Sequence, residues 1–326
     1  MKIEVIGSGA LGMLFGGLLA ASGDEVAFWT RTVEQAATLR ERGIVVKGQD
    51  DSELHIAPKI FTASPITEAT ENTRQDTPDW ILLTVKQRHI DASLLSGMKA
   101  RMGNNTKIAC FQNGVGHIEK IKTSFGGNSV YAVITTEGAK REEGSVVIRA
   151  GHGATRIGIT GYSRFANLAK SGSEKNETSK KAGESLVNRL EKAGFESFLS
   201  NDIDKEIYRK LLINAVINPL TALLRIPNGE LLEGEDRAEL IRQLCEEGIR
   251  VYQACSIPYD SDMNAIIADV CRSTSTNTSS MLKDVLEGLP TEVDYINGHL
   301  VEMARSVNLQ VPGHETLWRL IRALPT

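Results

Sequence analysis

The feature that most constrains this chain is a glycine pattern near its N-terminus, in the stretch KIEVIGSGALGMLFGGLLAASGDEVAFWTR at residues 2–31. Gly7, Gly9 and Gly12 form G-x-G-x-x-G directly after the apolar segment IEVI and before a helix-forming run that ends at Gly23. In such a turn the first glycine permits a tight bend, the second admits a pyrophosphate, and the third lets helix and strand pack closely. We therefore predict a dinucleotide-binding strand, turn and helix.

The same stretch admits a second interpretation, a secretory signal peptide, because Lys2 precedes an apolar run that ends in small residues. A signal peptide needs only hydrophobicity, so glycines at ordered positions would have no purpose in it. The segment DEVAFWTR at residues 24–31 is typical of a second strand, which completes a strand, helix and strand unit of about 30 residues. This context favours the nucleotide-binding turn and a cytoplasmic protein.

The end of the predicted second strand bears on which dinucleotide is bound. An acidic residue normally stands there and binds the ribose 2′-hydroxyl of NAD, but this chain has Arg31 between two threonines. A guanidinium can bind a 2′-phosphate with two hydrogen bonds, so we expect NADPH or NADP+ as the cofactor. The alternative is a solvated arginine that caps a loop. The predicted cofactor-binding residues of this region are Gly7, Ser8, Gly9, Ala10, Leu11, Gly12 and Arg31.

Composition argues against several other kinds of protein. A formal net charge of -4 at pH 7 gives no reason to expect a nucleic-acid partner. After residue 21 no apolar run approaches the ~20 residues that a membrane span requires. The four cysteines have no ligand spacing with the six histidines, so we expect no metal site and no disulfide framework, which suits a reducing compartment. The expected partner is a small-molecule substrate, and the expected state is a monomer or homodimer.

The length of 326 residues favours two domains. We predict an α/β, Rossmann-type NADP-binding domain over residues 1–182, because short apolar strands dominate this part of the chain. Strands are predicted at 3–6, 24–31, 44–49, 53–61, 79–86, 106–114, 129–139, 144–150 and 154–159, with helices at 10–23 and 32–43. The polar residues 161–183 are interpreted as an insertion or linker loop. Residues 183–326 are predicted to form an all-helical substrate-binding and catalytic domain.

A stripe of polar residues marks one helix of the second domain, in the segment YRKLLINAVINPLTALL at residues 208–224. Lys210, Asn214 and Asn218 recur every four residues, so they lie along one edge of a helix whose other faces are apolar. Buried polar groups need partners, which indicates that the stripe lines a polar cavity. The alternative is that the asparagines bond neighbouring helices and the lysine extends to solvent. Pro219 is expected to kink the helix and leave carbonyl groups free.

Three segments carry a resemblance to a known family: the N-terminal glycine motif, RKLLINAVINPLTALLRIPNGELL, and SSMLKDVLEGLPTEVDYINGHLVEMA. Through them the chain resembles the ketopantoate reductase (2-dehydropantoate 2-reductase) family over essentially its whole length. The resemblance implies a Rossmann-type domain followed by an all-α domain like the C-terminal domain of 6-phosphogluconate dehydrogenase. It also implies NADPH-dependent reduction of 2-dehydropantoate to (R)-pantoate, a step of pantothenate and coenzyme A biosynthesis.

The resemblance assigns roles to individual residues. In that family the lysine of K-x-x-x-N-x-x-x-N-P is the general acid, here Lys210, and the glutamate of T-E-x-D-Y, here Glu292, lies beside it and the cofactor. The residues implied to bind substrate are Asn113, Lys210, Asn214, Asn218, Asn228 and Ser280. The further residues implied to contact the cofactor are Lys86, Asn113, Ala139 and Glu292.

Each of these residues also has a structural interpretation. Glu292 would favour a helix dipole as a first-turn carboxylate, and Ser280 would serve as an N-cap. Asn113 and Asn228 each precede a glycine and are ordinary turn formers. Lys86 would be a solvated strand end. Their joint match to the spacing of one family favours the functional interpretation.

Reduction of a 2-oxo acid requires hydride at the carbonyl carbon and a proton at its oxygen. Lys210 suits the second task, because burial lowers an ordinary lysine pKa of about 10.4 towards neutrality. Glu292 would orient the ammonium group, and no metal is required. The substrate stays open between 2-dehydropantoate and another 2-oxo acid, and a catalytically silent NADPH-sensing protein is the alternative from a different class.

Overall fold

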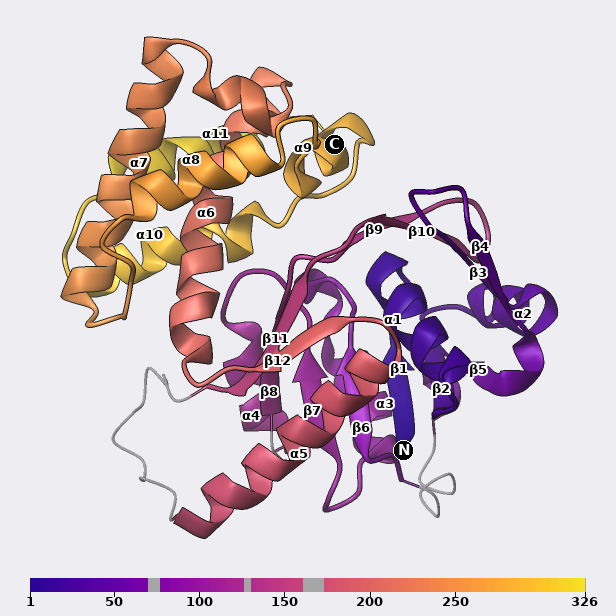
Figure 1. Ribbon diagram of the computed structural model, residues 1–326. Coiled ribbons are helices and arrows are strands. Elements are labelled where there is room, and N and C mark those ends of the chain that lie inside the picture. Colours follow the sequence, from indigo (N-terminus) through magenta and orange to yellow (C-terminus); the bar gives the residue numbers. More distant parts are fainter. Residues whose placement is uncertain (70–76, 126–129, 161–172, 326) are drawn as a thin grey trace. The chain divides into compact units, whose positions relative to one another are not determined.

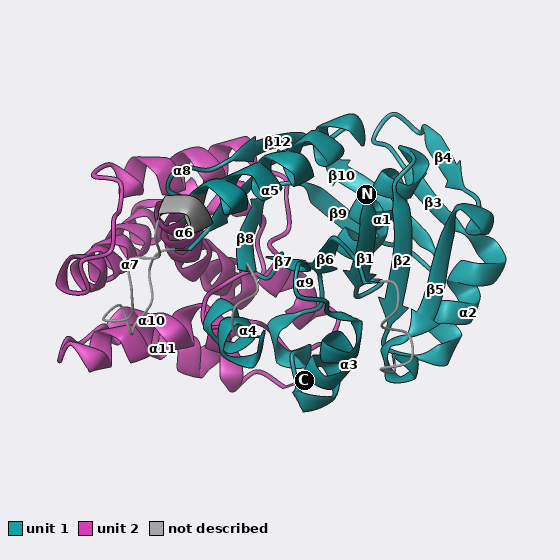
Figure 2. Cartoon of the chain, turned by 90° about the horizontal axis from the view of Figure 1, so that it is seen from below, with its two compact units in different colours: residues 1–112, 117–203 teal, residues 113–116, 204–326 magenta. Residues whose placement is uncertain are grey.

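The computed structural model describes the chain in four stretches (Figure 1), which are residues 1–69, 77–125, 130–160 and 173–325. The chain divides into two compact units, coloured separately in Figure 2. Unit 1 comprises residues 1–112 and 117–203, and unit 2 comprises residues 113–116 and 204–326. The predicted α/β domain followed by a helical domain is confirmed by the order of the elements.

Among the described residues of unit 1, eight strands form the larger sheet, in the order β12-β11-β8-β7-β6-β1-β2-β5. Their bounds are β1 Lys2–Ile6, β2 Glu25–Thr30, β5 Phe61–Pro65, β6 Trp80–Leu83, β7 Lys107–Cys110, β8 Val130–Thr135, β11 Ala154–Ile159 and β12 Glu196–Leu199. Neighbouring strands are parallel except β8 and β11. The chain builds outward from β1 to β2 and β5, and then returns to place β6 on the other side of β1. This reversal is the switch point at which open α/β sheets bind ligands, beyond the carboxyl ends of the strands.

A smaller sheet of unit 1 has the order β4-β3-β10-β9 within the described part of the chain. Its bounds are β3 Ile44–Lys47, β4 Glu53–Ile56, β9 Gly138–Arg141 and β10 Val146–Gly151. Residues 53–61 and 129–139 were each predicted to form one strand, which was wrong. Each range contributes strands to both sheets, because alternating apolar residues reveal a strand but not its partner.

The helices of unit 1 cover both faces of the larger sheet, and they are α1 Ala10–Ala21, α2 Val33–Arg42, α3 Ala92–Arg101, α4 His117–Phe125 and α5 Ser173–Lys192. Helix α1 contacts both sheets and is enclosed between them. Gly16 faces the larger sheet, since a Cβ there would lie 2.6 Å from Phe28 Cζ and 2.8 Å from Val5 Cγ2. Gly17 faces the smaller sheet, where a Cβ would lie 2.9 Å from Ile56 Cδ1.

A buried charged cluster joins β1 to α3 on the opposite face of the larger sheet. Glu4 alternates with Val5 along β1, so its carboxylate points away from α1. Arg101 at the end of α3 donates to Glu4 from Nε at 3.0 Å and from a terminal nitrogen at 2.5 Å, and Trp29 Nε1 donates to the same carboxylate at 2.7 Å. Each charge therefore has partners, which a buried ion pair requires.

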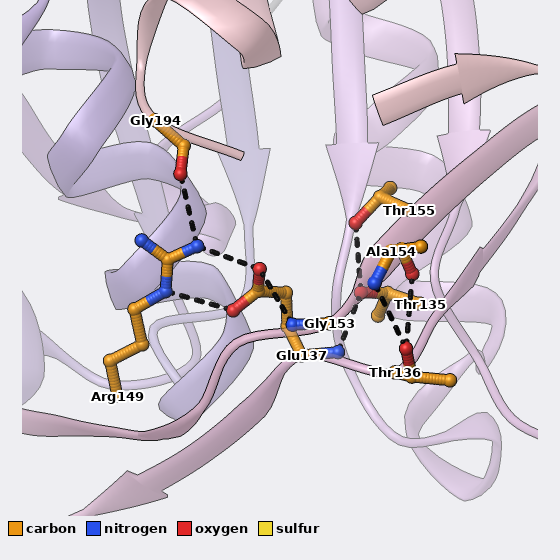
Figure 3. Close-up of polar contacts among 8 residues, drawn as sticks. All are labelled: Thr135, Thr136, Glu137, Arg149, Gly153, Ala154, Thr155 and Gly194. Atoms are coloured by element: carbon orange, nitrogen blue, oxygen red, sulfur yellow. Dashed lines mark hydrogen bonds and ion pairs between the residues drawn. The ribbon is translucent and has the colours of Figure 1, made fainter. Parts of the chain in front are cut away.

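A second buried ion pair fastens the two sheets to each other where the chain crosses between them (Figure 3). Glu137, between β8 and β9, accepts two hydrogen bonds from Arg149 on β10, at 2.9 and 2.7 Å. The same carboxylate accepts from Gly153 N at 3.3 Å, and Arg149 also donates to Gly194 O at 3.1 Å. Glu137 lies two residues before Ala139. The sequence pattern did not distinguish Glu137 and Arg149 from charged residues on the protein surface.

The boundary between the units differs from the sequence-based one. Residues 173–183, interpreted as part of a polar loop, belong to α5, while residues 161–172 lie outside the described residues. Helix α5 packs against β11 and β12 of the larger sheet, so the division falls between residues 203 and 204 and not between 182 and 183. The helical periodicity of residues 173–183 is weak because nearly all of them are polar. Helices α3 and α4 were also not predicted.

Unit 2 is helical throughout its described residues, with a long helix α6 that carries the polar stripe. Its α-helices are α6 Ile203–Leu224, α7 Glu235–Ala254, α8 Met263–Ser273, α9 Ser280–Leu286, α10 Asn297–Ser306 and α11 Pro312–Arg322, with short 3-10 helices at Asn228–Leu232 and Val293–Tyr295. Helix α7 packs on α6, and Tyr252 donates to Tyr208 O at 2.8 Å across this contact. In the parts of the chain that the structure describes, no helix is both long enough and apolar enough to span a membrane.

Candidate active site

The glycine turn follows β1, as the sequence predicts, and its geometry explains each glycine. Gly7 has φ +110°, and a Cβ there would lie 2.8 Å from Val85 Cγ1. A Cβ on Gly12 would lie 1.9 Å from Gly7 O, which no side chain tolerates. A Cβ on Gly9, in contrast, would meet nothing within 4 Å, so the backbone at this position borders open space.

Helix α1 begins at this turn without the usual side-chain cap. Gly9 is the N-cap residue, and no acidic side chain stands in the first turn. The turn is held from outside by Thr84, whose Oγ1 donates towards Ile6 O at 3.1 Å and Gly7 O at 2.9 Å. Backbone N–H groups at a helix N-terminus attract anions, so the arrangement at Ser8, Ala10 and Leu11 can accept a pyrophosphate.

Basic side chains gather at the carboxyl ends of β2 and β6. Arg31 follows β2 and is exposed, with its backbone N–H donating to Gln35 Oε1 at 3.2 Å. Past β6, burial lowers the pKa of His89, and the neighbouring charges of Arg88, Arg31 and Lys86 lower it further. Arg88 Nε also donates to His89 Nε2 at 3.3 Å. These basic side chains can bind a phosphate. Arg31 and Lys86 were predicted from the sequence, but Arg88 and His89 were not.

Gln112 and Asn113 follow β7 at the same edge of the larger sheet. The side chain of Gln112 is buried and donates from Nε2 to Leu83 O and Val85 O, both at 2.8 Å. Asn113 is half-buried and precedes Gly114, which has φ +76°. Ala139 is half-buried on β9, where it pairs in register with Arg149.

In unit 2, α6 presents the predicted stripe, with buried apolar residues around it from Leu211 onward. Lys210 and Asn214 are half-buried, and Asn218 is buried. The buried apolar residues around them on α6 are Leu211, Leu212, Ala215, Val216, Ile217 and Leu220. Burial lowers the pKa of Lys210 to about 8, and the charge of Glu292 opposes that decrease. The structure therefore brings the predicted proton donor and its predicted carboxylate close enough to interact electrostatically.

Pro219 does not leave a carbonyl free for a ligand, contrary to the sequence-based expectation. A proline at this position removes the N–H that would bond to Ala215 O, four residues earlier. Asn297 Nδ2 supplies that hydrogen bond instead, at 2.8 Å. It also lies 3.1 Å from His314 Nδ1, and His314 Nε2 lies 2.9 Å from Leu244 O. Burial lowers the pKa of His314 to about 4, so the ring is neutral, and its contacts join α7, α10 and α11.

Ser280 is the first residue of α9, but its hydroxyl is not the helix cap. The N-cap is Ser279, whose Oγ accepts from Leu282 N at 3.1 Å, while Ser280 is exposed. Ser279 Oγ also lies 2.7 Å from Thr221 Oγ1 on α6, and both residues are buried. The hydroxyl pair therefore ties the start of α9 to the helix that carries the stripe, and the structural interpretation of Ser280 as a cap was wrong.

The remaining predicted residues of unit 2 lie at two short 3-10 helices. Asn228 is buried, and its Nδ2 donates to Thr274 Oγ1 at 2.9 Å while its Oδ1 has no hydrogen-bonding partner within the described residues. Glu292 is half-buried and precedes the 3-10 helix Val293–Tyr295 without capping it through its side chain. The dipole interpretation of Glu292 thus has no capping hydrogen bond to support it.

No group of three or more histidine, cysteine, aspartate or glutamate side chains suited to a metal ion occurs in the described stretches. Cys110, Cys245, Cys255 and Cys271 are free thiols. Burial raises the pKa of Cys110 to about 12, so this thiol stays protonated at neutral pH.

Comparisons with known proteins cover the whole chain. Residues 3–161 match the family model described as ketopantoate reductase PanE/ApbA, and residues 202–325 match its C-terminal counterpart. A 2-dehydropantoate 2-reductase from Pyrococcus abyssi is 33% identical over 324 residues, which cover 99% of this chain and 97% of that protein. A crystal structure of a probable 2-dehydropantoate 2-reductase from Bacillus subtilis is 29% identical, with a TM-score of 0.77 over 99% of this chain and 100% of the other. The ternary structure of D-mandelate dehydrogenase with NADH and anilino(oxo)acetate has a TM-score of 0.85 at 24% identity, over 99% of this chain and 97% of that one, which shows a shared fold.

Proposed function

The chain belongs to the ketopantoate reductase family, and on that premise we propose that it reduces 2-dehydropantoate to (R)-pantoate with NADPH. The observation that carries the proposal is Lys210, a lysine beside buried apolar residues of α6, whose pKa burial lowers to about 8. A buried ammonium group does not stabilise a helix, so its presence needs another reason. A reductase needs a proton donor whose pKa lies near the working pH.

Lys210 donates its proton to the carbonyl oxygen of the substrate as negative charge develops there. Its pKa of about 8 keeps most of the ammonium protonated at pH 7 while making it a stronger acid than an exposed lysine. Glu292 stabilises the ammonium, so that the buried charge is not unpaired. After each turnover Lys210 regains a proton from solvent.

The neighbouring polar groups of unit 2 hold the substrate. Asn214 and Asn218 extend the edge of α6 that Lys210 begins, so their amides offer hydrogen bonds to the hydroxyl and oxo groups of a short 2-oxo acid. Ser280 offers an exposed hydroxyl at the start of α9 for the substrate carboxylate. The buried Oδ1 of Asn228 is an acceptor for a substrate hydroxyl. Fixed donors and acceptors of this kind convert binding energy into reactive orientation.

The residues of unit 1 fit a dinucleotide. Gly9 borders open space beside the uncapped N-terminus of α1, where a pyrophosphate would be held by backbone N–H groups. Lys86 and Ala139 of unit 1, together with Asn113, which is assigned to unit 2, are the further residues proposed to contact the cofactor. Bound NADPH supplies the hydride that reduces the 2-oxo carbon.

The preference for NADPH over NADH is proposed to come from Arg31. Its guanidinium is exposed at the end of β2, and Lys86 and Arg88 add positive charge close by. One charged hydrogen bond to the 2′-phosphate contributes about 1.5 to 3 kcal/mol, which corresponds to a preference of roughly 10- to 150-fold.

The decisive experiment measures NADPH oxidation by the purified full-length protein with 2-dehydropantoate and with a panel of other 2-oxo acids, an aromatic one included. We expect the highest kcat/KM for 2-dehydropantoate. A higher value for another 2-oxo acid would replace the proposed substrate but not the reaction. Cofactor binding without turnover of any 2-oxo acid would support an NADPH sensor. Size-exclusion chromatography of the same sample tests the proposed monomer or homodimer.

Two variants of α6 test the proton donor. Lys210→Ala should lower kcat by roughly 10²- to 10⁴-fold and leave NADPH binding intact, because a general acid contributes about that much. Lys205→Ala is the matched control, since Lys205 lies on the same helix and pairs with Asp260 at 2.7 Å. In the wild type, kcat/KM should fall as pH rises through about 8, where Lys210 loses its proton. Normal turnover by Lys210→Ala would reject the assignment.

A further inference from the structure

Gln112 has a side chain whose orientation is fixed by the backbone around it. It follows β7 directly and is 6% exposed. Its Nε2 donates to Leu83 O and Val85 O, each at 2.8 Å, which are the carbonyls on either side of Thr84. Both partners only accept hydrogen bonds, so the NH2 end of the amide must face them and the oxygen must face away.

The amide oxygen of Gln112 is left without a partner. Oε1 is buried and accepts no hydrogen bond from any described residue. A buried acceptor without a donor is costly, and native structures rarely retain one unless a ligand or water completes it. Rotation of the amide would place Oε1 against the two backbone carbonyl oxygens, so the side chain cannot supply the missing hydrogen bond by turning.

The place of Gln112 in the sheet indicates which ligand group reaches it. The glycine turn follows β1, and Arg31 follows β2 on one side of β1. Strands β6 and β7 lie on the other side of β1. If the pyrophosphate lies at the turn and the adenosine phosphate lies at Arg31, the nicotinamide half extends over the ends of β6 and β7.

The nicotinamide ring carries a carboxamide, and the NH2 of that group is the hydrogen-bond donor at this end of the cofactor. We propose that Gln112 Oε1 accepts a hydrogen bond from the carboxamide N–H of the bound nicotinamide. This inference rests on the proposed dinucleotide cofactor and adds a residue that recognises its reactive end. The bond restricts rotation of the ring and so helps to present one face of it to the substrate.

The test compares three probes by calorimetric titration of the full-length wild type: NADP+, its 3-acetylpyridine analogue and 2′,5′-ADP. The analogue keeps the carbonyl group but replaces NH2 with methyl, and 2′,5′-ADP lacks the nicotinamide half. We expect NADP+ to bind about 2- to 10-fold more tightly than the analogue, which is the effect of one hydrogen bond. Equal binding of NADP+ and the analogue would overturn the proposal without any variant.

Gln112→Met removes the acceptor and keeps the length of the side chain. It should weaken NADP+ until the affinities of NADP+ and the analogue are equal, while 2′,5′-ADP binds as before. An unchanged ratio between NADP+ and the analogue, or a parallel loss of 2′,5′-ADP binding, would overturn the proposed contact; the second result would show that Gln112 only supports the turn. Gln243→Met, an exposed glutamine on α7, is the control and should bind all three probes like the wild type.

These readouts are independent of turnover, so they separate the two proposals. If wild-type protein binds neither NADP+ nor 2′,5′-ADP, the proposed cofactor itself is wrong. If both bind and the acetylpyridine analogue binds as tightly as NADP+, only the role of Gln112 is wrong.

Discussion

Replacing Lys210 with methionine should stabilise the folded protein while it abolishes the proton donor. The pKa of Lys210 is lowered from 10.5 to about 8, mainly by burial. Each tenfold change in proton affinity corresponds to about 1.4 kcal/mol, so the charged side chain costs the folded state about 3 kcal/mol at pH 7. This value is an upper limit, because Lys210 is only half-buried and solvent screens part of the cost. Methionine fills a similar volume without a charge.

The free-energy cost of burying the charged Lys210 side chain decreases as pH rises. Between about pH 8 and 10.5 the unfolded chain keeps the proton on Lys210 while the folded chain releases it. Stability therefore rises with pH in this window, and about 2 kcal/mol of the cost should disappear between pH 7 and about pH 9.5. Below about pH 8 both states are protonated and the cost is constant. The methionine variant has no such contribution at any pH.

The free energies of unfolding of the wild type and Lys210→Met are measured at pH 7 and about pH 9.5 by denaturant titration followed by circular dichroism. The difference between the two proteins is then compared between the two pH values. We expect Lys210→Met to exceed the wild type by up to about 3 kcal/mol at pH 7 and by about 1 kcal/mol at about pH 9.5. Lys205→Met, which loses an ion pair with Asp260, should not be stabilised. A stability difference between Lys210→Met and the wild type that is the same at both pH values would refute the reasoning.

Three other substitutions follow from the structure. Arg31→Asp should remove the roughly 10- to 150-fold preference for NADPH over NADH, measured as the ratio of kcat/KM values, and an unchanged ratio would show that the 2′-phosphate is bound elsewhere. Thr221→Val should break the link to Ser279 and raise KM for the 2-oxo acid about 2- to 10-fold with NADPH affinity unchanged, and Thr221→Ser should restore it. Arg101→Met should lower the unfolding free energy by about 3 to 5 kcal/mol, measured by chemical denaturation, because it leaves the buried carboxylate of Glu4 without its ion-pair partner. Adding Glu4→Leu to this variant should recover much of that loss.

The sequence predicted well where one local pattern determines the structure. The glycine turn and the helix after it depend on backbone space within a few residues. The helix predicted at 32–43 is α2, which Thr32 caps by accepting from Gln35 N and which ends at Gly43. The stripe of Lys210 and Asn214 depends only on helical periodicity.

Features that depend on distant partners were not accessible in the same way. The Glu137 and Arg149 pair lies where the chain crosses between the two sheets, and both residues look like ordinary surface charges in the sequence. Likewise, Pro219 predicted an unpaired carbonyl, but its replacement donor is Asn297, and no local signal links the two positions. The unsatisfied amide oxygen of Gln112 could not be predicted either, since its missing partner is visible only when its neighbours are placed.

The enclosure of α1 between two sheets has a mechanical consequence. Gly16 and Gly17 keep this helix thin on the two sides that contact the sheets. A methyl group at Gly16 would have to displace the ring of Phe28 and the side chain of Val5, whereas one at Gly17 would meet only the end of the flexible Ile56 side chain. Because the first turn of the same helix is the proposed pyrophosphate site, a shift of α1 away from the larger sheet would also move its N–H groups. Gly16, which is remote from the proposed ligand, is therefore expected to influence cofactor affinity through the spacing between α1 and the larger sheet.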